Sequence, residues 1–187
     1  TPTMGGTLIL SSIFLSVEMW GDLENRYLWV AFFRARSLGV LGWIDDRLKI
    51  KHQSSDGLSP LNKIFWQSVI TILACSYLYV TQENISETSL IVPFFKDISI
   101  PLGVGFIALS YFVVIGTSNA VNLTDGLDGL AILPCVMVAA GLGIIGYLAG
   151  NAIYSDYLNI PYLPGTGEMI VFCGALVGSG IGVLWFN

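Results

Sequence analysis

Six apolar stretches, separated by more polar segments, restrict what this chain of 187 residues can fold into. Each is close to the roughly 20 apolar residues that a helix needs to cross a bilayer. No alternating pattern indicates a closed β-barrel, so helix is the conformation that satisfies their backbone hydrogen bonds in lipid. The sequence therefore predicts an all-α, polytopic transmembrane bundle of about six spans, with residues 1–187 forming a single membrane domain. The expected spans are residues 4–20, 27–44, 64–80, 102–121, 130–149 and 169–186.

The composition agrees with a membrane protein and argues against several other classes. Apolar residues make up 54% of the chain and charged residues only 11%, against roughly 25% charged residues in soluble domains. The net charge is −5 and no basic run exists that would follow a phosphate backbone, so we expect no nucleic-acid partner. The three cysteines lie far apart within apolar stretches, without the spacing of zinc ligands.

Basic residues are concentrated in one connecting segment, residues 45–63, and this predicts the orientation of the bundle. The segments 81–101 and 150–168 together contain a single lysine. By the positive-inside rule, residues 45–63 face the cytoplasm. Alternation across six spans then places residues 1–6, residues 116–129 and Asn187 on the same side. The basic residues of segment 45–63 are Arg47, Lys49, Lys51 and Lys63.

Two segments do not follow the simple pattern. Arg34 and Arg36 interrupt the second span, where each costs about 2.5–3.5 kcal/mol at the helix centre. They point to nearly opposite sides of a helix, so one partner cannot serve both. Glu18 of the first span is a candidate partner. Otherwise the arginines snorkel to an interface, or this span is marginal. The run 89–95 is compatible with a short extracellular hairpin or with an interfacial segment.

Acidic residues gather in two segments that the predicted topology brings to one face of the membrane. Asp45 and Asp46 end the second span, and adjacent carboxylates repel each other unless a cation neutralises them. An ordinary helix-end acid pair balanced by Arg47 and Lys49 is the alternative. Residues 119–130 read Asn-Ala-Val-Asn-Leu-Thr-Asp-Gly-Leu-Asp-Gly-Leu. Asn122, Asp125 and Asp128 share a face if this segment is helical, whereas its Asp-Gly pairs are equally natural in tight turns.

These residue types indicate a site for phosphate and a hard metal ion. Carboxylate and amide oxygens without clustered Cys or His favour Mg²⁺ or Mn²⁺ over zinc. Mg²⁺ is typically held by one or two carboxylates together with substrate phosphates. Nearby lysines attract an anionic substrate, and no Walker-type glycine loop supports ATP binding. The sequence therefore predicts a cytoplasm-facing metal and phosphate site, with Asp45, Asp46 and Asp128 as candidate metal ligands.

Several of these segments resemble the phospho-N-acetylmuramoyl-pentapeptide transferases, a group within the polyprenyl-phosphate hexosamine-1-phosphate transferase family. The resemblance implies a multi-pass enzyme of the bacterial inner membrane that acts in peptidoglycan synthesis, in cell-wall biogenesis, cell shape and division. The implied reaction transfers phospho-MurNAc-pentapeptide from UDP-MurNAc-pentapeptide to undecaprenyl phosphate, giving lipid I and UMP, with Mg²⁺. The similar segments are residues 1–6, 42–46, 92–96, 119–130 and 184–187.

The resemblance also implies roles for individual residues. Asp45 and Asp46 match the catalytic aspartate pair, one of them a base for undecaprenyl phosphate or a group that holds it. Lys49 matches a lysine near the diphosphate, and Asn187 an asparagine of the uridine pocket. The family's Phe-Met-Gly-Asp motif would begin beyond Asn187, so we expect an internal fragment of a longer transferase. The residues matching the motif that holds the nucleotide and metal region are Asn122, Asp125, Gly126, Leu127 and Asp128.

Other interpretations stay open at the level of sequence. A related enzyme that uses a UDP-N-acetylhexosamine would share the aspartate pair, and the chain could be an inactive fragment. Acids among helices also line ion or solute pathways in transporters. The oligomeric state is open as well, with a homodimer as one assembly.

Overall fold

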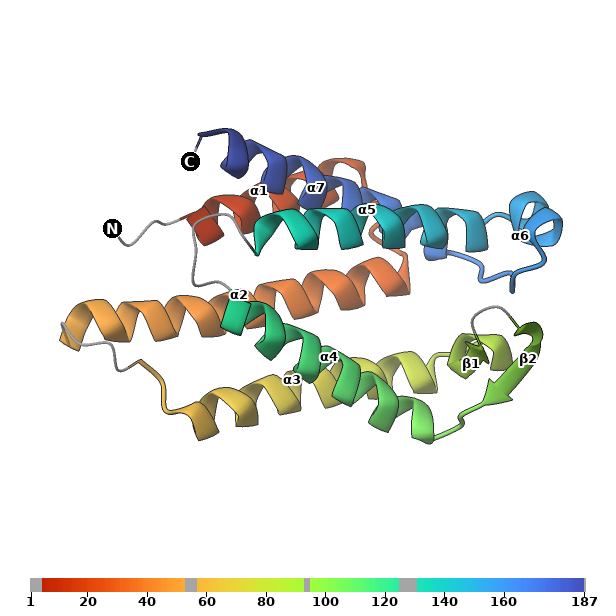
Figure 1. The fold of residues 1–187 in the computed structure, drawn as a ribbon, viewed down its shortest axis with the longest axis horizontal. Coiled ribbons are helices and arrows are strands. Elements are labelled where there is room, and N and C mark those ends of the chain that lie inside the picture. The colour runs from red at the N-terminus through yellow and green to blue at the C-terminus, as the bar shows by residue number, and fades with distance from the viewer. Residues whose placement is uncertain (1–4, 53–56, 93–94, 125–130, 187) are drawn as a thin grey trace.

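The computed structural model describes residues 5–52, 57–92, 95–124 and 131–186. Helices dominate this part of the chain (Figure 1). Two 3-10 turns, η1 (Ile85–Thr88) and η2 (Thr166–Glu168), and a two-stranded hairpin of β1 (Ser89–Val92) and β2 (Phe95–Pro101) lie between helices. The α-helices are α1 (Gly5–Trp20), α2 (Arg26–His52), α3 (Pro60–Val80), α4 (Gly105–Thr124), α5 (Ile132–Ala149), α6 (Ala152–Leu158) and α7 (Met169–Phe186).

Each of the six predicted spans coincides with a helix, and the all-α membrane class is confirmed. Four helical stretches are long and apolar enough to cross a bilayer, and α1 is a shorter apolar helix. α2 is not among the four, although its 27 residues correspond to about 40 Å of helix. Its two internal arginines and the charged residues near its end account for that difference. The four spanning stretches are Pro60–Val80, Gly105–Thr124, Ile132–Ala149 and Thr166–Phe186.

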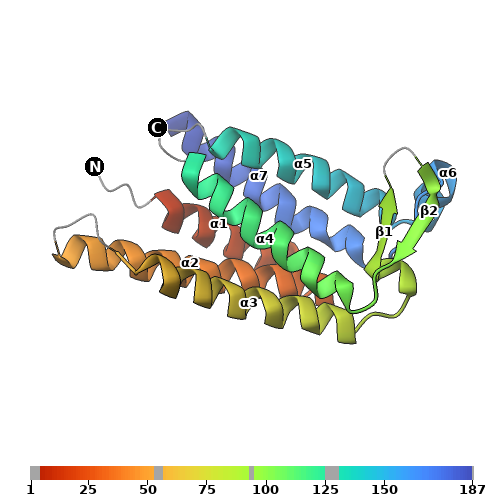
Figure 2. The same ribbon diagram turned by 60° about the horizontal axis from the view of Figure 1, so that its bottom comes forward.

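The helices form two packed groups joined through α2. α7 packs against α1 and α5, α3 packs against α2 and α4, and α2 also contacts α1 and α7 (Figure 2). The most buried cluster lies where α1 meets α2, and Val17 and Leu28 are each only 1% exposed within it. The rings of Phe14 and Phe32 lie 4.9 Å apart between their centroids. This junction fixes α2, and with it the acid pair near the end of α2.

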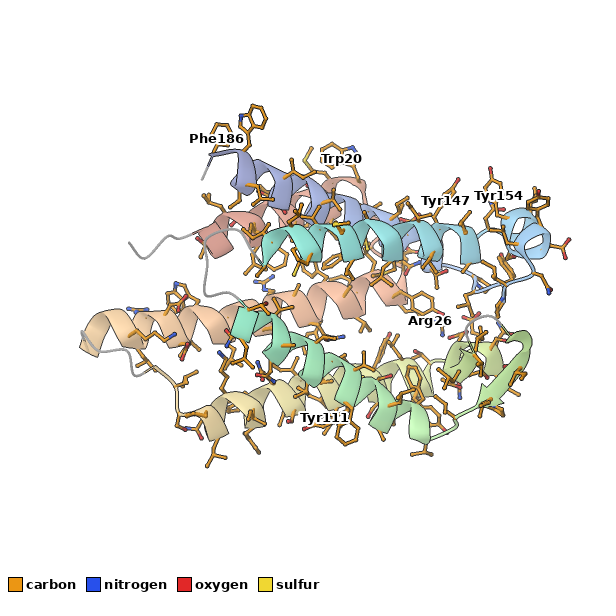
Figure 3. All side chains as sticks on the ribbon, viewed as in Figure 1. Trp20, Arg26, Tyr111, Tyr147, Tyr154 and Phe186 are labelled. Carbon is orange, nitrogen blue, oxygen red and sulfur yellow. The ribbon has the colours of Figure 1, made fainter. Side chains whose placement is uncertain are left out.

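Large apolar side chains cover the outside of the bundle. α4 contains no buried residue, and Trp20 and Phe186 are 69% and 89% exposed. Figure 3 shows both of these side chains on the outer surface of the bundle. Apolar surface on this scale is unfavourable in water, and a surrounding bilayer explains it.

The long helices run in alternating directions, so that polar segments far apart in sequence meet at one end of the bundle. Figures 1 and 2 show the end of α2, the end of α4 and the end of α7 at this end. The hairpin and α6 lie at the opposite end. This arrangement agrees with the alternation inferred from the basic residues. We call the end of the bundle where α2, α4 and α7 terminate the acid-pair end, and the end with the hairpin and α6 the hairpin end.

Hydrogen bonds tie the elements of the hairpin end together. Arg26, which begins α2, donates from one guanidinium nitrogen to both carboxylate oxygens of Glu87 at 2.8 Å, and it also donates to the carbonyl of Thr81. Asn25 donates to the carbonyl of Gly165 at 2.8 Å. Figure 3 shows Arg26 between the bundle and the hairpin. The strands pair in antiparallel register, with Ser89 opposite Pro101, so the hairpin alternative for this segment is the correct one.

The two arginines of α2 behave differently from each other. Arg34 is half-buried and Arg36 is exposed. Among the described residues, neither forms an ion pair with Glu18. Arg36 and Glu18 instead line one small cavity of about 290 Å³ together with apolar side chains. The Nε atom of Arg34 is buried without a hydrogen-bond partner in the described part of the chain. Glu18, the candidate partner, is therefore not an ion-pair partner of either arginine among the described residues.

Candidate active site at the end of α2

Three charged side chains lie on successive turns near the end of α2. Lys49 follows Asp45 by four residues and Asp46 by three, and helical side chains at these spacings are neighbours. The Lys49 ammonium is 2.7 Å from Oδ2 of Asp45 and 3.6 Å from Oδ1 of Asp46. Lys49 is therefore a shared cation for the acid pair, with the shorter contact to Asp45.

The two aspartates lie in opposite environments. The side chain of Asp45 is 10% exposed, whereas that of Asp46 is 75% exposed. The backbone N–H of Leu58 donates to Oδ1 of Asp45 at 2.7 Å. Each oxygen of Asp45 thus has a partner from within the protein, while the carboxylate of Asp46 faces outward and can meet a ligand.

Electrostatics keep Asp45 ionised. Burial by itself would raise the pKa of Asp45, but the hydrogen bonds from Lys49 and from the Leu58 N–H outweigh burial. The positive charges of Lys49 and Lys63 act in the same direction, so the pKa lies below its ordinary value. The hydrogen bond to Asp45 in turn raises the pKa of Lys49, against a smaller opposing effect of burial. The pair is therefore an anion and a cation at neutral pH.

Arg47 does not take part in this neutralisation. Its guanidinium lies over the ring of Trp43, 4.9 Å from the centroid, in a cation–π contact. Among the ion pairs of the described residues, Lys49 is the partner of both aspartates. Of the two basic residues considered as balancing the helix-end acid pair, Lys49 therefore does so and Arg47 does not.

The second predicted wall of the site begins at the end of α4. Asn122 is exposed on the last turn of this helix. One turn earlier, Asn119 donates to the carbonyl of Ile115 at 2.8 Å and to the side chain of Gln67 in α3 at 3.5 Å. Gln67 is buried, with 6% of its surface exposed. The contact with Gln67 joins the end of α4 to α3.

Five predicted site residues lie outside the described part of the chain, and their roles stay predictions. The end of α2 and the end of α4 nevertheless share the acid-pair end of the bundle (Figures 1 and 2). The segment that carries four of these residues follows α4 directly. The five residues are Asp125, Gly126, Leu127, Asp128 and Asn187.

The donor set suits a hard cation such as Mg²⁺. The exposed carboxylate of Asp46 supplies oxygens of the kind that Mg²⁺ prefers, whereas both oxygens of Asp45 already have partners within the protein. Within the described ranges no group of three or more His, Cys, Asp or Glu side chains converges. One or two carboxylates together with substrate phosphates are the usual magnesium environment, so the exposed carboxylate of Asp46 fits that role best. Asp128, the third predicted ligand, lies outside the described residues.

Two contacts of the site were not predicted from the sequence. The Leu58 N–H donates to Asp45 from 13 residues further along the chain, and a backbone donor leaves no signal in residue types. Gln67 was not singled out either, although a long polar side chain within an apolar span is a signal for a buried contact. Ser68 of the same helix also bonds the hydroxyl of Tyr111 in α4 at 2.9 Å. Hydrogen bonds between polar side chains thus join α3 to α4 at two positions.

A comparison with protein families identifies the class of this protein. The family model described as glycosyl transferase family 4 matches residues 28–187. The match begins in the first turn of α2, extends through α7 and includes every predicted site residue. It confirms the predicted relationship to polyprenyl-phosphate sugar-1-phosphate transferases at the level of the family. It also favours a transferase over the solute pathway considered from the sequence. The chain belongs to glycosyl transferase family 4.

Proposed function

We propose that this protein transfers phospho-MurNAc-pentapeptide from UDP-MurNAc-pentapeptide to undecaprenyl phosphate, forming lipid I and UMP. The reaction would take place at the cytoplasmic face of a bacterial inner membrane. The observation that carries the proposal is the cluster of Asp45, Asp46 and Lys49 at the acid-pair end. The segment 119–130, which resembles the muramoyl-pentapeptide transferases, starts within α4 at the same end.

The reaction is a phosphoryl transfer between two membrane-proximal substrates. An oxygen of the lipid phosphate attacks the β-phosphorus that carries the sugar. A bond forms between that oxygen and the β-phosphorus, and the bond from the β-phosphorus to the bridging oxygen breaks. The bridging oxygen and its electron pair leave with UMP. Such reactions depend mainly on positioning and on stabilising charge at the phosphates.

The charged residues of α2 supply these two effects. Lys49 places a positive charge beside the acid pair, which attracts the diphosphate of the nucleotide sugar. Asp46 is the aspartate with an open carboxylate, and with Asp128 it would hold Mg²⁺. When bound, Mg²⁺ neutralises charge on the diphosphate and on the leaving UMP. Asp45 keeps Lys49 in place through the 2.7 Å contact between their side chains.

The decisive experiment measures UMP release by the purified protein in detergent with undecaprenyl phosphate. Asp46→Asn keeps the size of the side chain and removes its charge. We expect a loss of turnover of about 100-fold or more, the scale on which a lost catalytic contact acts. Asp156→Asn, an exposed change in α6 at the hairpin end, serves as the matched control. Near-normal UMP release by Asp46→Asn would refute the assigned role.

Two further assays test the metal and the sugar substrate separately. Activity should disappear in excess chelator and return with added Mg²⁺, and full activity in chelator would refute the metal. Parallel assays with UDP-MurNAc-pentapeptide and UDP-N-acetylglucosamine identify the sugar. Consumption of UDP-N-acetylglucosamine alone would replace the muramoyl substrate while leaving the transferase class intact.

A further inference from the structure

Gly57 lies directly against the carboxylate of Asp45. A Cβ atom at position 57 would lie 2.2 Å from Oδ1 of Asp45 and 2.9 Å from Cε of Lys49. Cβ atoms in proteins essentially never approach other heavy atoms closer than 3.0 Å. Any side chain at position 57 would therefore displace the aspartate, the lysine or the loop. The absence of a side chain allows the next residue, Leu58, to bring its N–H to 2.7 Å from the same oxygen.

The start of α3 anchors this donor. Ser59 is the N-cap residue, and its side chain accepts from the N–H of Asn62 at 3.3 Å. Pro60 occupies the first turn of the helix, where its fixed φ is favourable. The carbonyl of Ser59 also accepts from the N–H of Lys63 at 3.0 Å. The Leu58 N–H therefore projects from the beginning of a regular helix, and α3 fixes its position relative to α2.

The result is a division of the acid pair into an internal and an external member. Oδ1 of Asp45 is occupied by Leu58 and Oδ2 by Lys49. Among the described residues, the contact of Asp46 is the 3.6 Å approach of Lys49, and its side chain remains 75% exposed. An ammonium group has three donors, so Lys49 keeps donors for a phosphate after bonding Asp45. Its position is nevertheless fixed by that bond.

We propose that Gly57 and the Leu58 N–H form a positioning element that holds Asp45 as the internal anchor of Lys49 and leaves Asp46 to meet the substrate. The assignment of Asp46 to the substrate rests on the proposed function. The hydrogen bond and the close approach at position 57 do not. Preorganisation explains the benefit, because a ligand-binding lysine locked by neighbouring groups loses less freedom when the ligand binds.

The first test measures the hydrogen bond without any enzyme assay. Amide hydrogen exchange at Leu58 is followed in the purified protein in detergent. We expect exchange about 10-fold or more faster in Asp45→Ala than in the wild-type protein, because a bond to an ionised acceptor is lost. Asp46→Ala should leave the Leu58 amide as protected as in the wild type. Equal exchange in wild type and Asp45→Ala would overturn the proposal.

The second test connects this bond to turnover. Gly57→Ala is compared with Gly141→Ala, whose added methyl group in α5 meets nothing within 4 Å. We expect Gly57→Ala to accelerate Leu58 exchange and to lower kcat/KM by about 10-fold or more, while Gly141→Ala stays within about 2-fold of wild type. Faster exchange with normal turnover would overturn the functional division. Reduced turnover with unchanged Leu58 exchange would overturn the route through Asp45.

The two tests also separate this inference from the proposed function. If the wild-type protein releases no UMP from any UDP-N-acetylhexosamine, the proposed function fails. The exchange comparison between wild type and Asp45→Ala still decides the positioning element in that case. The same comparison decides it if Gly57→Ala does not fold.

Discussion

Replacing Arg26 with methionine should destabilise the protein through the hairpin end. Arg26 begins α2 and bonds both carboxylate oxygens of Glu87 at 2.8 Å, and it also bonds the carbonyl of Thr81 at the end of α3. The side chains are 17% exposed for Arg26 and 6% exposed for Glu87. Methionine keeps much of the apolar stem and removes the charge. The variant therefore removes the ion pair together with the hydrogen bond to Thr81.

The expected magnitude follows from what Glu87 retains. Removing one partner of a buried ion pair costs about 3–5 kcal/mol, because the remaining charge is uncompensated. Glu87 still accepts from the backbone N–H groups of Glu83 and Asn84 at 3.1 and 3.2 Å. These donors offset part of the penalty, so we expect a loss of about 2–3 kcal/mol. Glu87→Gln should lose less, because the glutamine amide oxygen can still accept from Arg26 and the remaining charge, Arg26, is the more exposed partner.

Reversible unfolding in mixed micelles, repeated across pH, measures this prediction. Burial alone would raise the pKa of Glu87, but hydrogen bonds from the Glu83 N–H, Arg26 and Tyr27 lower it below its ordinary value. The stabilisation is then complete above the unfolded pKa of about 4.5 and is lost as the pH falls through the folded pKa. The difference between wild type and Arg26→Met should shrink on acidification. A difference under about 0.5 kcal/mol at neutral pH would refute the reasoning.

Two further predictions concern close packing and an unpaired group. In Gly150→Ala the new Cβ would lie 2.4 Å from the backbone N of Gly167. We therefore expect the free energy of unfolding, measured by thermal unfolding, to fall by about 1–3 kcal/mol, whereas Gly141→Ala should be nearly neutral. Equal stability of the two variants would contradict this prediction. Arg34→Met should raise stability by about 1 kcal/mol, because the Nε of Arg34 is buried without a partner among the described residues. Exposed Arg36→Met should change stability by less than about 0.5 kcal/mol, and a destabilised Arg34→Met would show that the guanidinium has a partner in the membrane.

Much of the fold was predictable because lipid leaves the backbone few choices. Long apolar stretches must be helical in a bilayer, and each predicted span coincides with a helix. The predictions were weaker where the chain meets water. The run after η1 was compatible with two structures, and it forms a hairpin. The sequence left the partner of the arginines in α2 open, since a side chain's reach depends on how α1 and α2 cross.

The sequence alone determined the membrane class, the alternation of the helices and the candidate acid pair. These properties follow from residue type and spacing, because an apolar stretch must be helical in lipid wherever it packs. Only the tertiary structure decided how Asp45 and Asp46 differ. Adjacent residues on a helix face different surroundings, and here one of them meets Lys49 and the Leu58 N–H while the other is exposed. That difference depends on the position of α3 relative to α2, and no spacing within a single helix encodes it.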